Sequence, residues 1–167
     1  MNQIIFLLTF FTFSFVNAQI KEVSETELNE KASTEIEEFI EKRFDADSTK
    51  LANKVYESYN LLIRNFPKSE KLSSYIYTKG CFAINVEESK NCFKEVVKAN
   101  DRKYYVRKSY LKLSWIAVRE KNYISALKFI DLIEKMEKPI FDCGTEMETY
   151  NTQLKNIRKH CKTGLKK

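Results

Sequence analysis

The sequence predicts an all-helical protein, built from helical hairpins that stack on one another. Glycine and proline are scarce, with 3 and 2 residues in a chain of 167, which disfavours turn-rich β architectures and long linkers. Runs of Lys, Glu, Leu, Ile and Tyr provide polar faces for water and apolar faces for packing, as amphipathic helices require. Small and apolar residues also recur at one fixed spacing. Together these features favour a helical repeat domain.

The first 18 residues have the pattern of a secretory signal peptide. They carry no charged side chain, and the apolar run from Ile4 to Val16 is shorter than the ~20 residues that span a membrane. Asn17 and the small residue Ala18 follow, as at a cleavage site, although no Lys or Arg precedes the apolar run. We expect export to the periplasm or the exterior, with cleavage near Ala18. A retained amphipathic or buried helix is the alternative.

Charge is divided unevenly along the chain. From Lys21 to Asp47 there are 10 acidic and 4 basic residues, net −6, whereas Ser48 to Lys167 has 13 acidic and 25 basic, net +12. We assign residues 19–33 to an acidic N-terminal segment, 34–161 to the repeat domain and 162–167 to a basic tail. A basic protein is often suspected of binding nucleic acid, but the expected export and the absence of zinc-finger or RNA-binding patterns argue against that partner. A solvated surface whose ends attract each other or an acidic neighbour is favoured.

Capping and helix-breaking residues divide the chain into seven expected helices. A Ser, Thr, Asp or Asn before a helix caps an orphan amide, and a Glu three residues later returns a bond in the capping box. Three pairs have that spacing: Thr34 with Glu37, Asn85 with Glu88, and Thr145 with Glu148. Further N-cap candidates are Ser48, Ser69, Asp101 and Asn122, and the two helix breakers are Pro67 and Pro139. In chain order the expected helices are 34–44, 49–65, 70–84, 86–99, 102–120, 123–137 and 146–160.

Equivalent positions in these helices recur at an offset of 37 residues. The small residues are Ala52, Ser89 and Ala126, and the larger ones that follow are Tyr56, Phe93 and Ile130. In the preceding helices the sets are Ile36, Ser73 and Tyr110; Phe39, Ile76 and Leu113; and Ile40, Tyr77 and Ser114. One more step reaches Met147, Tyr150 and Leu154 or its neighbours. A small residue lets two helices approach closely, and hairpins of this size bury their apolar stripes only by stacking. We therefore expect three hairpins and a terminal helix, with a non-repeating bundle as the alternative.

The stretch SYLKLSWIAVREKNYISALKFIDLIEKMEKP resembles a tetratricopeptide repeat. The residues close to the family's recurring positions are Leu113, Ala117, Tyr123, Ala126, Ile130 and Pro139. NVEESKNCF is a weaker copy, and NFPKSE at 65–70 resembles the junction between repeats of exported bacterial members. The spacing departs from the family's period of roughly 34 residues. The resemblance implies a helical-hairpin solenoid of about three TPR-like repeats plus a C-terminal capping helix. It also implies an adaptor or scaffold for a protein or peptide partner in the cell envelope.

In that family, the exposed inner side of each hairpin's first helix lines a concave groove. Carrying that side over by position gives seven candidate binding residues: Lys71, Tyr75, Thr78, Lys108, Lys112, Trp115 and Arg119. Spacings of three and four residues place each set on one helical face. Such a groove suits a peptide with acidic residues. Thr78 stands where members that clamp a C-terminal carboxylate need an amide, so that chemistry is not expected. Two alternatives remain open: a core position for Trp115, and solvated lysines on a structural subunit of an envelope assembly without an open groove.

Four cysteines and a single histidine limit the chemistry that we expect. Cys81 and Cys92 flank the expected turn of one hairpin and are a candidate disulfide, with two ordinary buried thiols as the alternative. Cys143 and Cys161 are about 27 Å apart if the helix between them is continuous, and their pairing stays open. The chain has no Gly-rich phosphate loop, HExxH motif or serine elbow, and His160 lies in a Lys-rich tail. We expect no enzymatic activity, no metal and no cofactor, and a thiol-redox or hydrolytic enzyme is the least favoured hypothesis.

Overall fold

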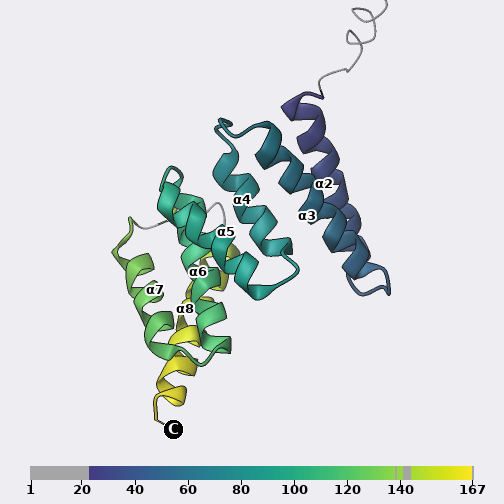
Figure 1. Ribbon diagram of the computed structural model, residues 1–167. Coiled ribbons are helices and arrows are strands. Elements are labelled where there is room, and N and C mark those ends of the chain that lie inside the picture. The colour runs from purple at the N-terminus through teal and green to yellow at the C-terminus, as the bar shows by residue number, and fades with distance from the viewer. Residues whose placement is uncertain (1–22, 138, 141–143, 167) are drawn as a thin grey trace, which may run out of the picture.

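The computed structural model describes residues 23–137, 139–140 and 144–166, and these residues form seven α-helices and no β-strand. The helices are α2 (Glu25–Glu41), α3 (Ser48–Asn65), α4 (Leu72–Phe82), α5 (Val86–Ala99), α6 (Lys103–Arg119), α7 (Tyr123–Lys135) and α8 (Gly144–Gly164). Each helix packs on the next one in the chain, and α6 also packs on α4 and on α8. Figure 1 shows the helices side by side, from α2 and α3 on the right to α6, α7 and α8 at lower left. The all-helical prediction is confirmed.

Several expectations concern parts of the chain outside the described residues. The signal peptide at 1–18 lies there, as does Cys143. None of the described helices is long and apolar enough to cross a membrane.

The first described helix starts well before residue 34, where the sequence predicted it to begin. Ser24 is the N-cap of α2: its hydroxyl accepts a hydrogen bond from the Glu27 amide at 3.2 Å, and the Glu27 carboxylate accepts one from the Ser24 amide at 3.1 Å. Thr34, the predicted cap, lies inside α2 and donates its hydroxyl hydrogen to the Glu30 carbonyl. The predicted start was wrong because Leu28 and Ala32 continue the buried stripe of the helix toward its N-terminus. Most of the expected acidic segment is therefore helix.

Two of the other predicted caps are confirmed. The side chains of Asn85 and Asn122 accept hydrogen bonds from the amides three residues later, at 2.8 and 3.1 Å, and begin α5 and α7. Ser69 and Asp101 do not cap helices, because Lys71 and Arg102 occupy the N-cap positions of α4 and α6. Thr145 lies inside α8, which begins at Gly144.

Three clusters of buried residues form the core. The N-terminal cluster joins α2, α3 and α4 through Leu28, Ala32, Val55, Tyr59, Leu62 and Tyr75. The central cluster joins α4 and α5 through Ile76, Cys92 and Val96. The C-terminal cluster joins α6, α7 and α8 through Ala117, Ala126, Ile130, Ile133, Ile157 and Cys161. Tyr56, Phe93 and Ile130, which the 37-residue offset relates, are all buried.

Small residues bring the helices of the second and third hairpins close together. A Cβ added to Gly80 of α4 would lie 2.8 Å from the Cβ of Cys92 in α5, and the Ser89 hydroxyl donates to the Gly80 carbonyl at 2.8 Å. In the next hairpin, Ala117 and Ala126 are buried in one cluster. The hairpins do not share one helix length, since α2, α4 and α6 have 17, 11 and 17 residues and α3, α5 and α7 have 18, 14 and 13.

Candidate binding groove between α6 and α8

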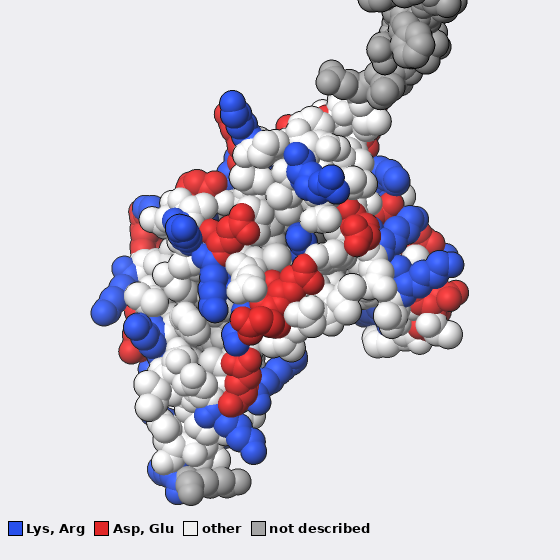
Figure 2. Space-filling model, in the orientation of Figure 1, with Lys and Arg blue, Asp and Glu red and all other residues white. Residues whose placement is uncertain are grey.

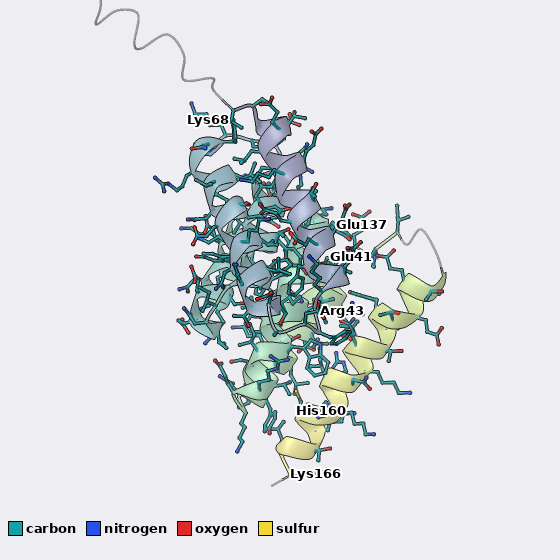
Figure 3. All side chains as sticks on the ribbon, turned by 90° about the vertical axis from the view of Figure 1, so that its right-hand side faces the viewer. Glu41, Arg43, Lys68, Glu137, His160 and Lys166 are labelled. Atoms are coloured by element: carbon teal, nitrogen blue, oxygen red, sulfur yellow. The ribbon has the colours of Figure 1, made fainter. Side chains whose placement is uncertain are left out.

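A groove of about 1090 Å³ runs between α6 and α8. The α6 wall contains Lys103, Tyr104, Arg107, Lys108, Leu111, Lys112 and Trp115. The α8 wall contains Thr145, Glu146, Thr149, Tyr150 and Gln153, and the remaining lining residues are Tyr77, Glu137, Pro139 and Ile140. Figure 3 shows Glu137 beyond the end of α7, where the chain turns toward α8. We call this feature the α6/α8 groove.

The structure brings three of the seven predicted site residues into this groove. Lys108, Lys112 and Trp115 line its wall together, as their shared helical face predicts. Arg119 is exposed at the end of α6 and is not among the lining residues. Lys71 and Thr78 also lie outside the lining. Of the predicted face, the part on α6 therefore lines this groove.

The predicted exposure of Tyr75 on an inner face is wrong, because this residue is buried in the N-terminal cluster. Only 2% of the residue is accessible to solvent. Its ring packs at 5.9 Å from the ring of Tyr59, and its hydroxyl donates to the Glu25 carboxylate at 2.8 Å. The first turn of α2, which the sequence did not predict, thus provides the partner that holds Tyr75 inside.

Trp115 combines the two roles that the sequence left open. It is half-buried and packs against the C-terminal cluster, and it also lines the groove. Its ring makes an edge contact with the exposed His160 of α8, with 6.0 Å between ring centroids. Trp115 therefore anchors α8 on α6 and offers part of its indole to the groove.

The lysines of the groove lie beside aromatic and acidic neighbours. The Lys108 Nζ lies 4.2 Å from the centroid of the Tyr104 ring, a distance suited to cation–π attraction. The Lys103 Nζ pairs with the Glu137 carboxylate at 2.9 Å, and this pair holds the pKa of Glu137 below its usual value. Lys112 is exposed. The groove thus carries positive charge next to aromatic surface.

Arg107 is the groove residue that the sequence did not reveal. It is 7% exposed, and one Nη atom donates to the backbone carbonyl of Glu137. Its Nε is buried and has no hydrogen-bond partner among the described residues. One signal was present in the sequence, since Lys103, Arg107 and Leu111 form a row at four-residue spacing beside the predicted face. That row could not be assigned to the groove without knowing that α8 packs against it.

The α8 wall was also missed, although the repeat offset had reached Tyr150. Tyr150 packs against the C-terminal cluster and lines the groove. Burial raises the pKa of its hydroxyl, and the positive charge of Arg107 opposes that rise. The side of α8 that faces α6 depends on how the chain returns after α7, which helical periodicity does not specify.

The predicted Cys81–Cys92 disulfide is wrong, since both residues are free thiols. Gly80 is the α4 residue that faces the Cβ of Cys92, and adjacent helical residues point about 100° apart. Cys81 is instead exposed and lies near Tyr77 and the positive charges of Lys108 and Lys112. Cys161 is buried in the C-terminal cluster. Burial raises the pKa of Cys92 and Cys161, which makes both thiols poorer nucleophiles.

Surface charge and metal-ligand geometry provide two further observations. Figure 2 shows acidic and basic side chains interspersed over the face seen in Figure 1, so neither sign covers that face. Within the described ranges, no three side chains of His, Cys, Asp or Glu are grouped so that they could hold a metal ion.

No family model, curated protein or solved structure matches the chain.

Proposed function

We propose that this protein is a non-enzymatic, exported adaptor or scaffold with a tetratricopeptide-like helical repeat, which binds a protein or peptide segment in the cell envelope. Sequential packing of the helices supports the repeat, as do the small residues at Gly80 and Ser89 and at Ala117 and Ala126. The signal-like segment at 1–18 motivates the export part of the proposal. The observation that carries the binding function is the α6/α8 groove.

The groove has the size and the chemistry that peptide recognition requires. Its volume of about 1090 Å³ lies just above the range for small-molecule pockets, roughly 300–1,000 Å³. Trp115, Tyr104 and Tyr150 supply aromatic area, which contributes most of the affinity at protein interfaces. The basic residues favour acidic partners and orient them. An extended segment with acidic and apolar residues matches both properties.

A pull-down from the envelope fraction tests this function. The bait is the wild-type protein, a Lys108→Ala, Lys112→Ala, Trp115→Ala groove variant, or a Lys68→Ala, Lys94→Ala, Lys98→Ala control at three exposed lysines on other elements. We expect the control to retrieve the same partner as the wild type and the groove variant to retrieve about tenfold less or lower.

Folding and assembly need separate checks in this experiment. A Lys108→Ala, Lys112→Ala double variant leaves the core contacts of Trp115 in place, and circular dichroism verifies that each variant is helical. Equal recovery by the groove variant and the control would show that the groove is not the binding surface. A stable oligomer in size-exclusion chromatography, with Trp115 shielded from quenchers, would favour a structural subunit instead.

A further inference from the structure

Arg107 places a buried and incompletely bonded guanidinium group in the wall of the groove. The residue is 93% shielded, given its 7% exposure, and it lines the groove. Its Nη bonds to the Glu137 backbone carbonyl, while the Glu137 carboxylate pairs with Lys103 at 2.9 Å. The Nε of Arg107 has no acceptor among the described residues. A buried guanidinium with an unbonded donor costs free energy, and a negative charge beside the group in the groove would offset part of that cost.

The charge around Arg107 favours an anion. Four lining residues are basic, namely Lys103, Arg107, Lys108 and Lys112, and two are acidic, namely Glu137 and Glu146. Because Lys103 already pairs with Glu137, the remaining positive charge of the α6 wall faces the groove beside Arg107. A guanidinium binds a carboxylate with two parallel bonds, which an ammonium cannot do.

The position of Arg107 along α6 specifies what else the ligand must carry. Lys103, Arg107, Leu111 and Trp115 line the groove at intervals of four residues. With a rise of ~1.5 Å per residue, Arg107 lies about 6 Å from Lys103 and about 12 Å from Trp115 along the helix. An extended chain advances ~3.3 Å per residue, so about three or four residues separate the group at Arg107 from the group at Trp115. The lining continues on both sides of Arg107, which suits a side chain within a segment better than a chain end.

We propose that Arg107 is the anion anchor of the α6/α8 groove, and that the bound segment carries an internal Glu or Asp about three or four residues from an aromatic or large apolar residue. The carboxylate binds the Arg107 guanidinium, and the apolar side chain contacts Trp115. This inference rests on the peptide-binding function proposed above and names the chemistry of the peptide.

A set of synthetic peptides tests the anchor. The probes are acetylated and amidated peptides of Ser and Ala with one Glu and one Phe, separated by one to six positions. Binding is measured by Trp115 fluorescence and by calorimetry. We expect the tightest binding at separations of three and four, and about tenfold weaker binding or worse when Gln replaces Glu in the peptide.

Arg107 variants separate a contact with the carboxylate from a structural role. Arg107→Met should weaken binding of the Glu peptide by about tenfold or more and leave binding of the Gln peptide unchanged. Arg107→Lys should restore only part of the lost affinity for the Glu peptide. Arg119→Met, at an exposed arginine of the same helix outside the groove, is the matched control and should change neither peptide. Circular dichroism confirms that each variant is folded.

Four results would overturn the inference. These are equal binding of the Glu and Gln peptides, equal weakening of both by Arg107→Met, better binding of a peptide whose only carboxylate is its C-terminus, and no binding of any peptide at millimolar concentration. Failure of the anchor can be distinguished from failure of the proposed function. If peptides bind the wild type, if the Lys108, Lys112 and Trp115 variant does not bind them, and if changing Arg107 has no effect, the groove function stands and only the anchor is wrong.

Discussion

At the two ends of the molecule, one of two positions related by the 37-residue offset is buried and the other is exposed. Tyr75 in α4 and Lys112 in α6 are 37 residues apart, yet Tyr75 is buried and Lys112 is exposed in the wall of a groove. The neighbours of the two residues differ. The Tyr75 hydroxyl donates to Glu25 of α2, whereas Lys112 lines the groove between α6 and α8. The elements around a helix thus determine whether a face lies in the core or lines a groove.

Two buried charges extend this comparison. Glu35 is 4% exposed within the α2/α3 pair, and neither of its carboxylate oxygens has a hydrogen-bond partner among the described residues. Its ion-pair partner, the Lys54 Nζ, is 3.9 Å away. Arg107 is similarly buried but lines a groove that a ligand can enter. A buried charge inside a helix pair lowers stability, whereas one in a groove wall can be satisfied by binding.

The largest expected effect tests whether the two ends fold as one unit. Leu62→Ala removes a fully buried side chain of the N-terminal cluster and should cost about 3 kcal/mol of unfolding free energy. Trp115, the single tryptophan of the chain, reports on the other end. If the central cluster couples the ends, urea unfolding followed by Trp115 fluorescence and by circular dichroism shifts to the same lower midpoint. Leu61→Ala, at a 41% exposed neighbour, is the control, and an unmoved fluorescence midpoint would show that the ends unfold separately.

The second prediction concerns the unbonded carboxylate at the N-terminal end. Glu35→Leu should stabilise the protein by about 1–2 kcal/mol, because an apolar side chain of similar size replaces a poorly paired buried charge. Thermal denaturation measures this as a higher Tm. Glu37→Leu, at an exposed position of the same helix, controls for helix propensity and should change stability by less than about 0.5 kcal/mol. A destabilised Glu35→Leu protein would remove the contrast with Arg107.

The third prediction concerns the hairpin that joins the two ends. Gly80→Ala gains about 1 kcal/mol in helix propensity, but the new Cβ would lie 2.8 Å from the Cβ of Cys92. We expect a net loss of about 1 kcal/mol, because α4 and α5 must separate. Urea denaturation measures it. The control is Gly144→Ala, where an added Cβ meets nothing within 4 Å, and a stabilised Gly80→Ala protein would show that close packing at this junction is unnecessary.

The smallest effect is pH-dependent and tests the contact that buries Tyr75. Hydrogen bonds from Ser69 and Tyr75 lower the pKa of Glu25 below its ordinary value of 4.5. A lowered folded-state pKa stabilises the protein above the unfolded-state pKa, and this contribution is lost as the pH falls through the folded-state value. Tyr75→Phe should therefore cost about 1 kcal/mol at neutral pH, and the difference from wild type should shrink below pH ~4.

Thermal denaturation across that pH range measures the Tyr75→Phe difference. Tyr104→Phe is the control, since Tyr104 is 48% exposed on α6. Loss of its hydroxyl should give no stability difference from wild type that depends on acid. A Tyr75→Phe difference that is constant with pH would mean that the ionised Glu25 is not what the hydroxyl stabilises.

The helical class, the breaks at Pro67 and Pro139, and the caps at Asn85 and Asn122 could all be predicted from the sequence. Each of these follows from local chemistry, since a cap needs only an amide three residues away and a proline lacks the amide that a helix interior uses. The 37-residue offset also identified three buried positions, and helical spacing placed Lys108, Lys112 and Trp115 on one face. These features repeat along the chain and can be recognised without knowing the neighbours of each helix.

Which helix faces are covered and which are open depends on how the helices pack in the folded chain. Periodicity shows that a helix has an apolar face, but it does not show which other helix packs there. The early start of α2 buries Tyr75, the return of the chain places α8 opposite α6, and that return turns Arg107 into a groove residue. Cys81 and Cys92 were misassigned for the same reason, because a rotation of one residue changes the face on which a side chain lies. Burial depends on contacts between distant segments, and those contacts exist only in the folded chain.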